Sequence, residues 1–326
     1  MRLPYIDCAK GVGILCITLM HFCNHFIPEV GCEFMGSFMI TIFYITSGWL
    51  SSLKGDNKTV SELCRIRWRQ LGRPYIYWSA IIIGFDAILC LCRYYSPSIL
   101  LQDVYKTFFL KGIGTLWFLP ALFMGEIIWT YLKDKKTLYV LFVFLTLLYK
   151  AFYTYNFVAV SDPSRVFQII RTPFNAFDNM LMAAIYISIG YFSYNNFKNW
   201  RTVHKVWSGL LLFALGFISA NYFKIPVIWH LLAPVLGPIG LLLLCQTLCK
   251  YFKERFFVFW GKNSLFLMVT HYSIILVIMR ICVINVFGIP YNGFVTFISF
   301  CVAILLEYIG LILIKKYFPK LVGKII

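Results

Sequence analysis

Ten runs of mostly apolar residues occupy most of this sequence, and each is long enough to cross a lipid bilayer as an α-helix. The hydrocarbon core of a bilayer is about 30 Å thick, which an α-helix spans with roughly 20 residues. The sequence therefore predicts an all-α integral membrane protein, a bundle of about ten transmembrane helices. The predicted spans are residues 6–27, 34–53, 74–95, 115–132, 137–156, 174–194, 206–223, 227–249, 263–287 and 293–314.

The composition supports a membrane environment and argues against two other classes of protein. Hydrophobic residues make up 60% of the 326 residues and charged residues only 13%, whereas soluble proteins carry about 25% charged residues. The net charge of +17 does not indicate nucleic-acid binding, because Lys and Arg lie in short clusters between the apolar runs. The 11 cysteines are scattered without a C-x-x-C pair, so we expect neither a metal site nor disulfide bonds.

The distribution of Lys and Arg between the loops predicts the orientation. The loops after even-numbered spans and the C-terminal end carry Lys54, Lys58, Arg65, Arg67, Arg69, Arg73, Lys133, Lys135, Lys136, Lys198, Arg201, Lys205, Lys250, Lys253, Arg255, Lys315, Lys316, Lys320 and Lys324. The loops after odd-numbered spans carry mainly Lys106, Lys111, Arg165, Arg171 and Lys224, with the acidic Glu29, Glu33, Asp103 and Asp162. By the positive-inside rule, we expect a multi-pass protein of the inner (plasma) membrane with both termini in the cytoplasm.

No second domain is indicated by the sequence. Arg2 precedes the first span, but no small-residue cleavage site follows, so we expect this span to be retained rather than removed as a signal peptide. The longest stretches between spans are about 20 residues, near 54–73, 96–114 and 157–173. We therefore expect a single transmembrane domain over residues 1–326, with no appended soluble domain.

The first span carries ionisable side chains along one face. Lys10 and His21 are eleven positions apart, three helical turns plus about 20°, with Asp7 and His25 about 40° to either side. His21 should lie about 16 Å deeper than Lys10. Such groups cost roughly 2.5–3.5 kcal/mol each inside a membrane and usually line a substrate path. Alternatively, Asp7 and Lys10 lie at the membrane surface and His21 hydrogen-bonds a neighbouring helix.

Three arginines follow the second span at four-residue spacing. Arg65, Arg69 and Arg73 would share one face of a helix, and Pro74 would open the third span. Guanidinium groups recognise phosphates through forked hydrogen bonds, which suits a nucleotide-bearing donor such as coenzyme A. The alternative is an ordinary cluster of cytoplasmic positive charge.

Small and polar residues also interrupt the second and fourth spans. Ser47 and Gly48, and Trp117 and Pro120, allow helices to approach closely or to break beside a cavity, although packing alone explains them as well. Glu126 needs a partner or water, which favours a cavity.

The ninth span begins with polar residues and carries a histidine. Asn263 or Ser264 can cap this helix at its start. His271 lies about two turns inside, where it is either a hydrogen-bonding core residue or a reactive group.

Taken in order, these motifs resemble the membrane-bound acyltransferase 3 family, known for O-acetyltransferases of sugars and cell-surface polysaccharides. Members typically have a basic residue, ten intervening positions and a histidine in the first helix, which Lys10 and His21 match, with Lys where many members have Arg. The resemblance covers nearly the whole chain. It rests on Asp7, Lys10 and His21, on Ser47-Gly48, on the arginines before Pro74-Tyr75, on Trp117–Pro120 and on residues 261–265 with His271.

The resemblance implies transfer of an acyl group, expected to be acetyl, from cytoplasmic acyl-CoA to a sugar or polysaccharide hydroxyl across the bundle. It implies that His21 is the general base, either in direct transfer or through an acyl-histidine. Acyl-CoA is then a donor substrate, and no bound cofactor, metal or nucleic acid is expected. The implied sites are catalytic Asp7, Lys10, His21 and Glu126, donor-binding Arg65, Arg69 and Arg73, and substrate-binding His25, Ser47, Trp117, Asn263 and His271.

Two other functions fit parts of the pattern. A polytopic secondary transporter also has broken helices and buried charges, but the two halves of this sequence show no convincing repeat. A membrane sensor module is the third possibility, although no soluble partner domain accompanies it.

Overall fold

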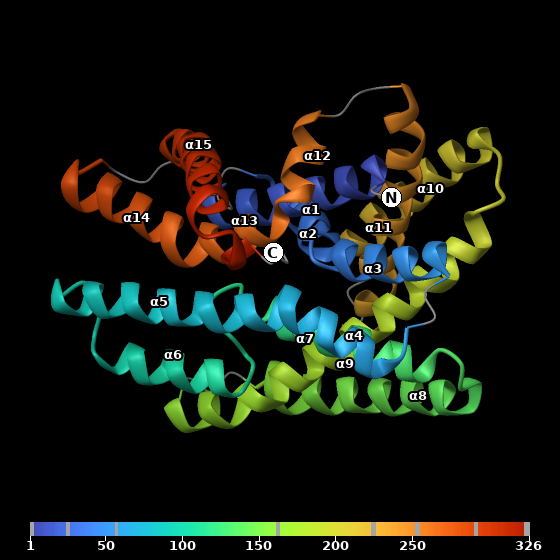
Figure 1. Ribbon diagram of the computed structural model, residues 1–326, viewed down its shortest axis with the longest axis horizontal. Coiled ribbons are helices and arrows are strands. Elements are labelled where there is room, and N and C mark those ends of the chain that lie inside the picture. The colour runs from blue at the N-terminus through green and yellow to red at the C-terminus, as the bar shows by residue number, and fades with distance from the viewer. Residues whose placement is uncertain are drawn as a thin grey trace. The chain divides into compact units, whose positions relative to one another are not determined.

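The computed structural model describes residues 3–23, 27–55, 58–160, 164–222, 226–251, 255–289 and 293–322. The described residues form helices and the loops between them, without a strand (Figure 1). His25 lies outside the described residues. The predicted all-α membrane fold is confirmed, because 8 helical segments of the described chain are long and apolar enough to cross a membrane.

Every predicted span overlaps a helix of the structure. The helices are α1 (Pro4–Cys23), α2 (Glu29–Phe38), α3 (Thr41–Lys54), α4 (Val60–Arg67), α5 (Arg73–Leu91), α6 (Ser98–Phe108), α7 (Phe118–Leu132), α8 (Lys136–Tyr153), α9 (Arg165–Phe197), α10 (Thr202–Tyr222), α11 (Pro226–Tyr251), α12 (Arg255–Lys262), α13 (Ser264–Thr270), α14 (Val277–Arg280) and α15 (Gly293–Tyr317). Wider π-helical turns are η1 (Trp68–Gly72), η2 (Thr154–Val158), η3 (His271–Leu276) and η4 (Ile281–Val286). The fourth predicted span corresponds to α7, of only 15 residues, and the sixth to part of α9.

The chain divides into two compact units, each assembled from three stretches of sequence. The first unit comprises Met1–Asn57, Ile185–Leu267 and Val286–Val302. The second comprises Lys58–Ala184, Met268–Asn285 and Ala303–Ile326. The long helices α9 and α15 contribute to both units, because the division falls within them.

Glycines bring helices of the first unit into backbone contact. A Cβ on Gly11 of α1 would lie 1.9 Å from the carbonyl oxygen of Phe257 in α12. A Cβ on Gly48 of α3 would lie 1.8 Å from the carbonyl oxygen of Ile187 in α9. Side chains do not tolerate such distances, so both crossings require glycine.

A proline in α11 ties that helix to α3. Proline has no N–H, so Pro238 leaves the carbonyl of Pro234 without its usual helical partner. The Thr41 hydroxyl donates a hydrogen bond to that carbonyl at 2.8 Å. A neighbouring helix therefore satisfies the backbone group that the proline releases.

In the second unit, the stretch between the second and third predicted spans, 54–73, is largely helical, as expected for Arg65, Arg69 and Arg73 on one helix. α4 begins at Val60 because Thr59 and Glu62 form a capping box. The Glu62 N–H donates to Thr59 Oγ1 at 3.3 Å, and the Thr59 N–H donates to Glu62 Oε2 at 2.9 Å. α5 follows η1 directly and begins at Arg73, so Pro74 lies in its first turn, as predicted.

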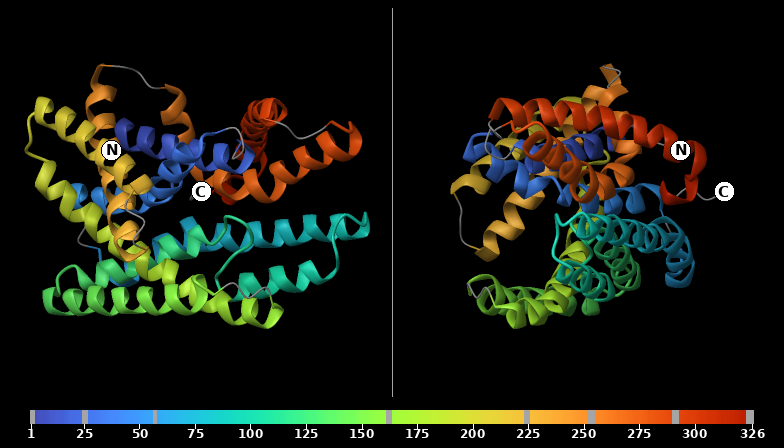
Figure 2. Two further views of the ribbon diagram at one scale, coloured as in Figure 1. Left: turned by 180° about the vertical axis from the view of Figure 1, so that it is seen from behind. Right: turned by 90° about the vertical axis from the view of Figure 1, so that its left-hand side faces the viewer.

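Hydrogen bonds join neighbouring helices within the second unit. α5 and α6 lie side by side (Figure 1), and the Tyr75 hydroxyl donates to the carbonyl of Thr107 at 2.8 Å. α8 and the first part of α9 also run alongside each other (Figure 2), joined by an ion pair of 2.7 Å between Lys150 and Asp178.

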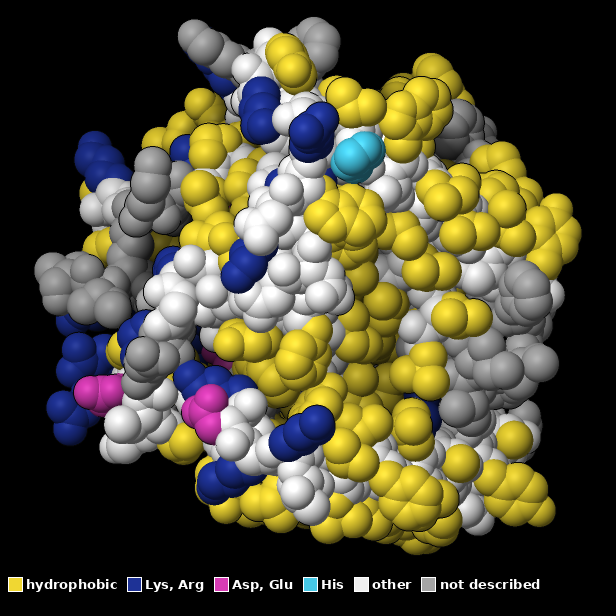
Figure 3. Space-filling view, turned by 90° about the vertical axis from the view of Figure 1, so that its right-hand side faces the viewer, with side chains coloured by type: hydrophobic (Ala, Val, Ile, Leu, Met, Phe, Trp, Pro, Cys, Tyr) yellow, Lys and Arg dark blue, Asp and Glu magenta, His cyan; other side chains and the backbone are white. Residues whose placement is uncertain are grey.

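Large apolar side chains are exposed on many helices. Val140 of α8 is 60% exposed, Leu211 of α10 60% and Leu305 of α15 58%. Figure 3 shows apolar side chains over much of the face that it draws, with Lys and Arg in separate groups. Apolar surface of this extent is unsuited to water and suits contact with lipid.

Candidate functional site

The described ionisable side chains of α1 lie on one unbroken helix, Pro4–Cys23. Asp7, Lys10 and His21 are each partly buried. In a continuous α-helix, Lys10 and His21 face the same side and are separated by about 16 Å along the axis. The helix can therefore present a positive charge and an imidazole along one path.

Contacts with α12 and α3 hold the N-terminal half of α1. A Cβ on Gly261 of α12 would lie 1.7 Å from the carbonyl oxygen of Asp7, so the two backbones touch. The indole N–H of the buried Trp49 in α3 donates to the Tyr5 hydroxyl at 3.0 Å. Asp7 and Lys10 therefore project from a fixed helix, which suits a site that must hold its geometry.

Arg65, Arg69 and Arg73 are exposed, on α4, η1 and α5 respectively. Exposure keeps their guanidinium groups within reach of a ligand from solution. The spacing prediction assumed a regular α-helix, but η1 lies within this stretch. Because a π-helical turn holds more residues than an α-helical turn, the rotation between these side chains differs from the one predicted for a regular α-helix.

Arg67, which lies between Arg65 and Arg69, makes a forked contact with the Glu126 carboxylate. Its Nη2 donates to Glu126 Oε1 of α7 at 2.8 Å, and its Nε pairs with Glu126 Oε2. Its Nη1 donates to the Gln70 side chain at 2.6 Å. The Glu126 side chain is only 6% exposed and that of Arg67 31%. Arg67 is thus the partner that the Glu126 carboxylate requires in an apolar span.

A tight loop precedes α7 and positions Trp117. Leu110, Gly112 and Gly114 have φ angles of 58°, 66° and 54°, in the left-handed region. A Cβ on Gly112 would lie 2.5 Å from the backbone nitrogen of Trp117, so the chain turns sharply there. Lys111 Nζ lies 5.9 Å from the centre of the partly buried Trp117 ring. The loop therefore places a cation beside an aromatic face.

His271 is fully buried and begins η3. The loop before α7 contacts the residues on either side of it. Thr115 Oγ1 donates to the carbonyl of Met268, and a Cβ on Gly114 would lie 2.4 Å from Ser273 Oγ. His271 therefore belongs to the interior of the second unit.

Ser47 and Asn263, both predicted to contact substrate, lie in the first unit. Ser47 is partly buried in α3, next to the close crossing at Gly48. The Asn263 side chain donates back to the carbonyl of Phe259 in α12 at 2.7 Å. This bond joins α12 to the start of α13.

A sequence model of the acyltransferase 3 family, described as an acyltransferase domain, matches residues 3–308. This chain belongs to that family. The matched range runs through both compact units and contains every described candidate residue. The protein is therefore a multi-pass membrane acyltransferase. In the other comparisons, no curated protein and no solved structure matched.

The acyltransferase has a further buried carboxylate that the sequence analysis did not select. Glu307 of α15 is 1% exposed and accepts the Thr270 hydroxyl, which lies 2.7 Å from Oε2 and 2.9 Å from Oε1. Thr270 directly precedes His271. Glu126 was selected because it is an ionisable residue inside an apolar span. Glu307, within the tenth predicted span, could have been found by the same criterion.

Arg67 was also missed as a site residue, because its spacing places it off the face shared by Arg65 and Arg69. Only the fold shows that this other face meets Glu126 of the acyltransferase. Among the described residues, no group of three or more His, Cys, Asp or Glu side chains is placed to hold a metal ion.

Proposed function

We propose that this acyltransferase transfers an acetyl group from cytoplasmic acetyl-CoA to a hydroxyl group of a sugar or cell-surface polysaccharide, with His21 as the general base. The observation that supports this most is α1, which carries the partly buried Lys10 and His21 on one face. Their separation of about 16 Å suits an extended pantetheine arm, with the nucleotide end near Lys10 and the thioester near His21.

The reaction needs one base and no oxidant or reductant. His21 takes the proton of the acceptor hydroxyl while that oxygen attacks the thioester carbonyl carbon. A carbon–oxygen bond forms, and the tetrahedral oxyanion then collapses with cleavage of the carbon–sulfur bond. His21 returns the proton to the departing thiolate, so the products are an ester and free coenzyme A.

We place the protein in the inner (plasma) membrane. In the proposed orientation, both termini lie in the cytoplasm. The exposed Arg65, Arg69 and Arg73 then meet the donor phosphates on the cytoplasmic side. Asp7 and Lys10 act at the donor end of the same path, and Glu126, held by Arg67, supports the site. The remaining proposed substrate contacts are His25, Ser47, Trp117, Asn263 and His271.

Consumption of the donor distinguishes this function from transport. Proteoliposomes containing the purified protein and radiolabelled acetyl-CoA should release free coenzyme A and transfer label to glycan. A transporter would move its substrate and leave the donor intact. In cells, mass spectrometry of surface glycans should show acetyl esters in the parent strain that a deletion strain lacks.

Replacing Arg65, Arg69 and Arg73 singly by Lys should raise the apparent KM for acetyl-CoA. Each change keeps the charge, but an ammonium group cannot make the forked contact with a phosphate. The matched control is Arg201→Lys, at another exposed arginine in a predicted cytoplasmic loop. If the KM for acetyl-CoA is unchanged in all three variants, these arginines serve only as cytoplasmic positive charge that orients the protein in the membrane.

Lys10→Ala should raise the KM for acetyl-CoA more than it lowers kcat. Its charge is proposed to contact the donor equally in the ground state and the transition state, whereas His21 acts in the reaction itself. Steady-state kinetics at varied donor concentration separates the two. A fall in kcat with unchanged KM would show that Lys10 acts in the chemical step instead.

A further inference from the structure

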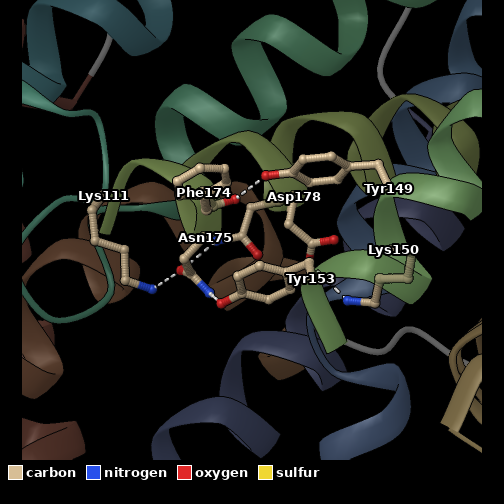
Figure 4. A network of polar contacts seen from close by, with 8 residues as sticks. Lys111, Tyr149, Lys150, Tyr153, Phe174, Asn175 and Asp178 are labelled. Atoms are coloured by element: carbon tan, nitrogen blue, oxygen red, sulfur yellow. Dashed lines mark hydrogen bonds and ion pairs between the residues drawn. The ribbon is translucent and has the colours of Figure 1, made fainter. Parts of the chain in front are cut away.

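The loop before α7 joins α8 and α9 through a partly buried polar network (Figure 4). Lys111 Nζ donates to Asn175 Oδ1 of α9. The amide of Asn175 in turn donates to the Tyr153 hydroxyl of α8 at 2.6 Å. Three elements of the second unit therefore converge on a lysine that is held in one position.

The negative charge of Asp178 acts on Lys111 but is shared with Lys150. Asp178 is paired with Lys150 at 2.7 Å, and the acceptor that Lys111 uses is the neutral amide of Asn175. Across the described parts of the chain, neither Lys111 nor Arg171 makes an ion pair with a carboxylate. Four cations, Lys106, Lys111, Lys150 and Arg171, act in this region with three carboxylates, Asp86, Asp103 and Asp178, so its net charge is positive.

Two further cations act on Lys111. Burial lowers the pKa of Lys111 to about 8, and the positive charges of Arg171 and Lys106 contribute to the shift. Lys106 itself has only a distant carboxylate partner, with Nζ 3.9 Å from Asp103 Oδ1. An anion placed among these three groups would relieve their mutual repulsion.

A proline fixes the position of Arg171 on α9. Pro173 has no N–H, so the carbonyl of Ile169 loses its helical partner. The Tyr105 hydroxyl of α6 donates to that carbonyl at 2.9 Å. α6, which carries Lys106, is thereby tied to the turn of α9 next to Arg171.

Membrane topology does not explain these charges. All three residues lie in the stretches that the sequence predicts between spans on the side after odd-numbered spans, where the positive-inside rule predicts few Lys and Arg. Lys111 and Arg171 are partly buried without a carboxylate ion pair among the described residues, which costs stability and favours a ligand here. Arg171 can bind a phosphate or carboxylate through two hydrogen bonds. The Trp117 ring beside Lys111 offers a flat apolar surface for a sugar ring.

We propose that Lys106, Lys111 and Arg171 bind an anionic group of the acyl acceptor, a phosphate or a carboxylate, on the side of the membrane opposite the donor. This inference rests on the proposed transfer to a glycan. The two sources of the anion are the phosphate of a lipid-linked sugar and the carboxylate of an acidic sugar.

The test measures binding without acetyl-CoA, so it does not depend on catalysis. Purified protein in nanodiscs of phosphatidylcholine is titrated calorimetrically with farnesyl phosphate, with glucuronic acid and with farnesol. We expect at least one of the two anions to bind more tightly than farnesol, and the stronger of them identifies the source. Equal binding of farnesol and farnesyl phosphate, with no binding of glucuronic acid, would overturn the proposal.

Variants locate the binding to these residues. Arg171→Gln and Lys111→Met should each weaken binding of the anion by about tenfold or more, and Lys111→Arg should retain it. Because Lys111 also supports the fold, thermal unfolding of each variant is measured alongside. The matched control is Lys136→Met, at an exposed lysine at the start of α8. If the control weakens anion binding equally, or Arg171→Gln does not weaken it, the anion binds through nonspecific charge attraction and the proposed site is overturned.

The outcome separates this inference from the proposed function. If the protein binds the anion but does not consume acetyl-CoA, the anion site is supported and the proposed acyl transfer is overturned. If Arg171→Gln and Lys111→Met transfer the acyl group normally, with unchanged KM for the acceptor, acyl transfer is supported and the anion site is overturned.

Discussion

Replacing His21 by Ala should lower kcat for acyl transfer by about 10²- to 10⁴-fold, the usual contribution of a general base, while the protein stays folded and inserted. His21 is partly buried near the C-terminal end of the unbroken α1. Without its imidazole, the helix loses the group proposed to take the proton of the acceptor hydroxyl. Release of coenzyme A from saturating acetyl-CoA in proteoliposomes measures the effect.

The control for this variant is His204→Ala, which removes an exposed histidine of α10. It should leave both turnover and thermal stability unchanged. Full transfer activity in His21→Ala would remove the proposed base from the mechanism. If His21→Ala fails to insert, His21→Gln tests the same point, because an amide keeps hydrogen bonding and cannot act as a base near neutral pH.

Replacing Arg67 by Met should destabilise the protein by about 2–3 kcal/mol, because the buried Glu126 carboxylate then loses its ion pair. The expected loss is below the roughly 3–5 kcal/mol of a fully buried pair, since 31% of the Arg67 side chain is exposed. Thermal unfolding in detergent measures it. Glu126→Leu should cost less, because the remaining guanidinium can turn toward water.

The double variant Arg67→Met with Glu126→Leu separates structure from chemistry. It removes both charges and should recover most of the stability lost in Arg67→Met. If Glu126 has the predicted catalytic role, the recovered protein remains inactive. If the pair only supports the site, activity returns with stability. Equal stability of Arg67→Met and wild type would show that the ion pair contributes nothing to the fold.

The arrangement of helices along the chain was predictable from the sequence. Apolar length is a local property, so all ten predicted spans overlap helices of the structure. The start of α4 could also have been predicted, because Thr59 and Glu62 have the spacing of a capping box, although the sequence analysis did not use it. The family followed from short motifs in order, which depend on residue identity alone.

The candidate site was predictable only where it lies on a single helix. The relation of Lys10 to His21 follows from the fixed rotation and rise of α1. By contrast, the π-helical turn η1 alters the face assigned to Arg65, Arg69 and Arg73, and spacing arguments built on a regular α-helix do not reveal it.

The sequence by itself determined that this chain forms apolar helices, which of them carry charge, and the family to which it belongs. The tertiary structure decided which partner each buried polar group has. It joined Arg67 to Glu126 and Thr270 to Glu307, and brought Lys111 to Asn175. These pairs are 59, 37 and 64 residues apart in the chain. The physical reason is that hydrophobicity acts along each helix, whereas hydrogen bonds and ion pairs form only between groups that the packing of helices brings within about 3 Å.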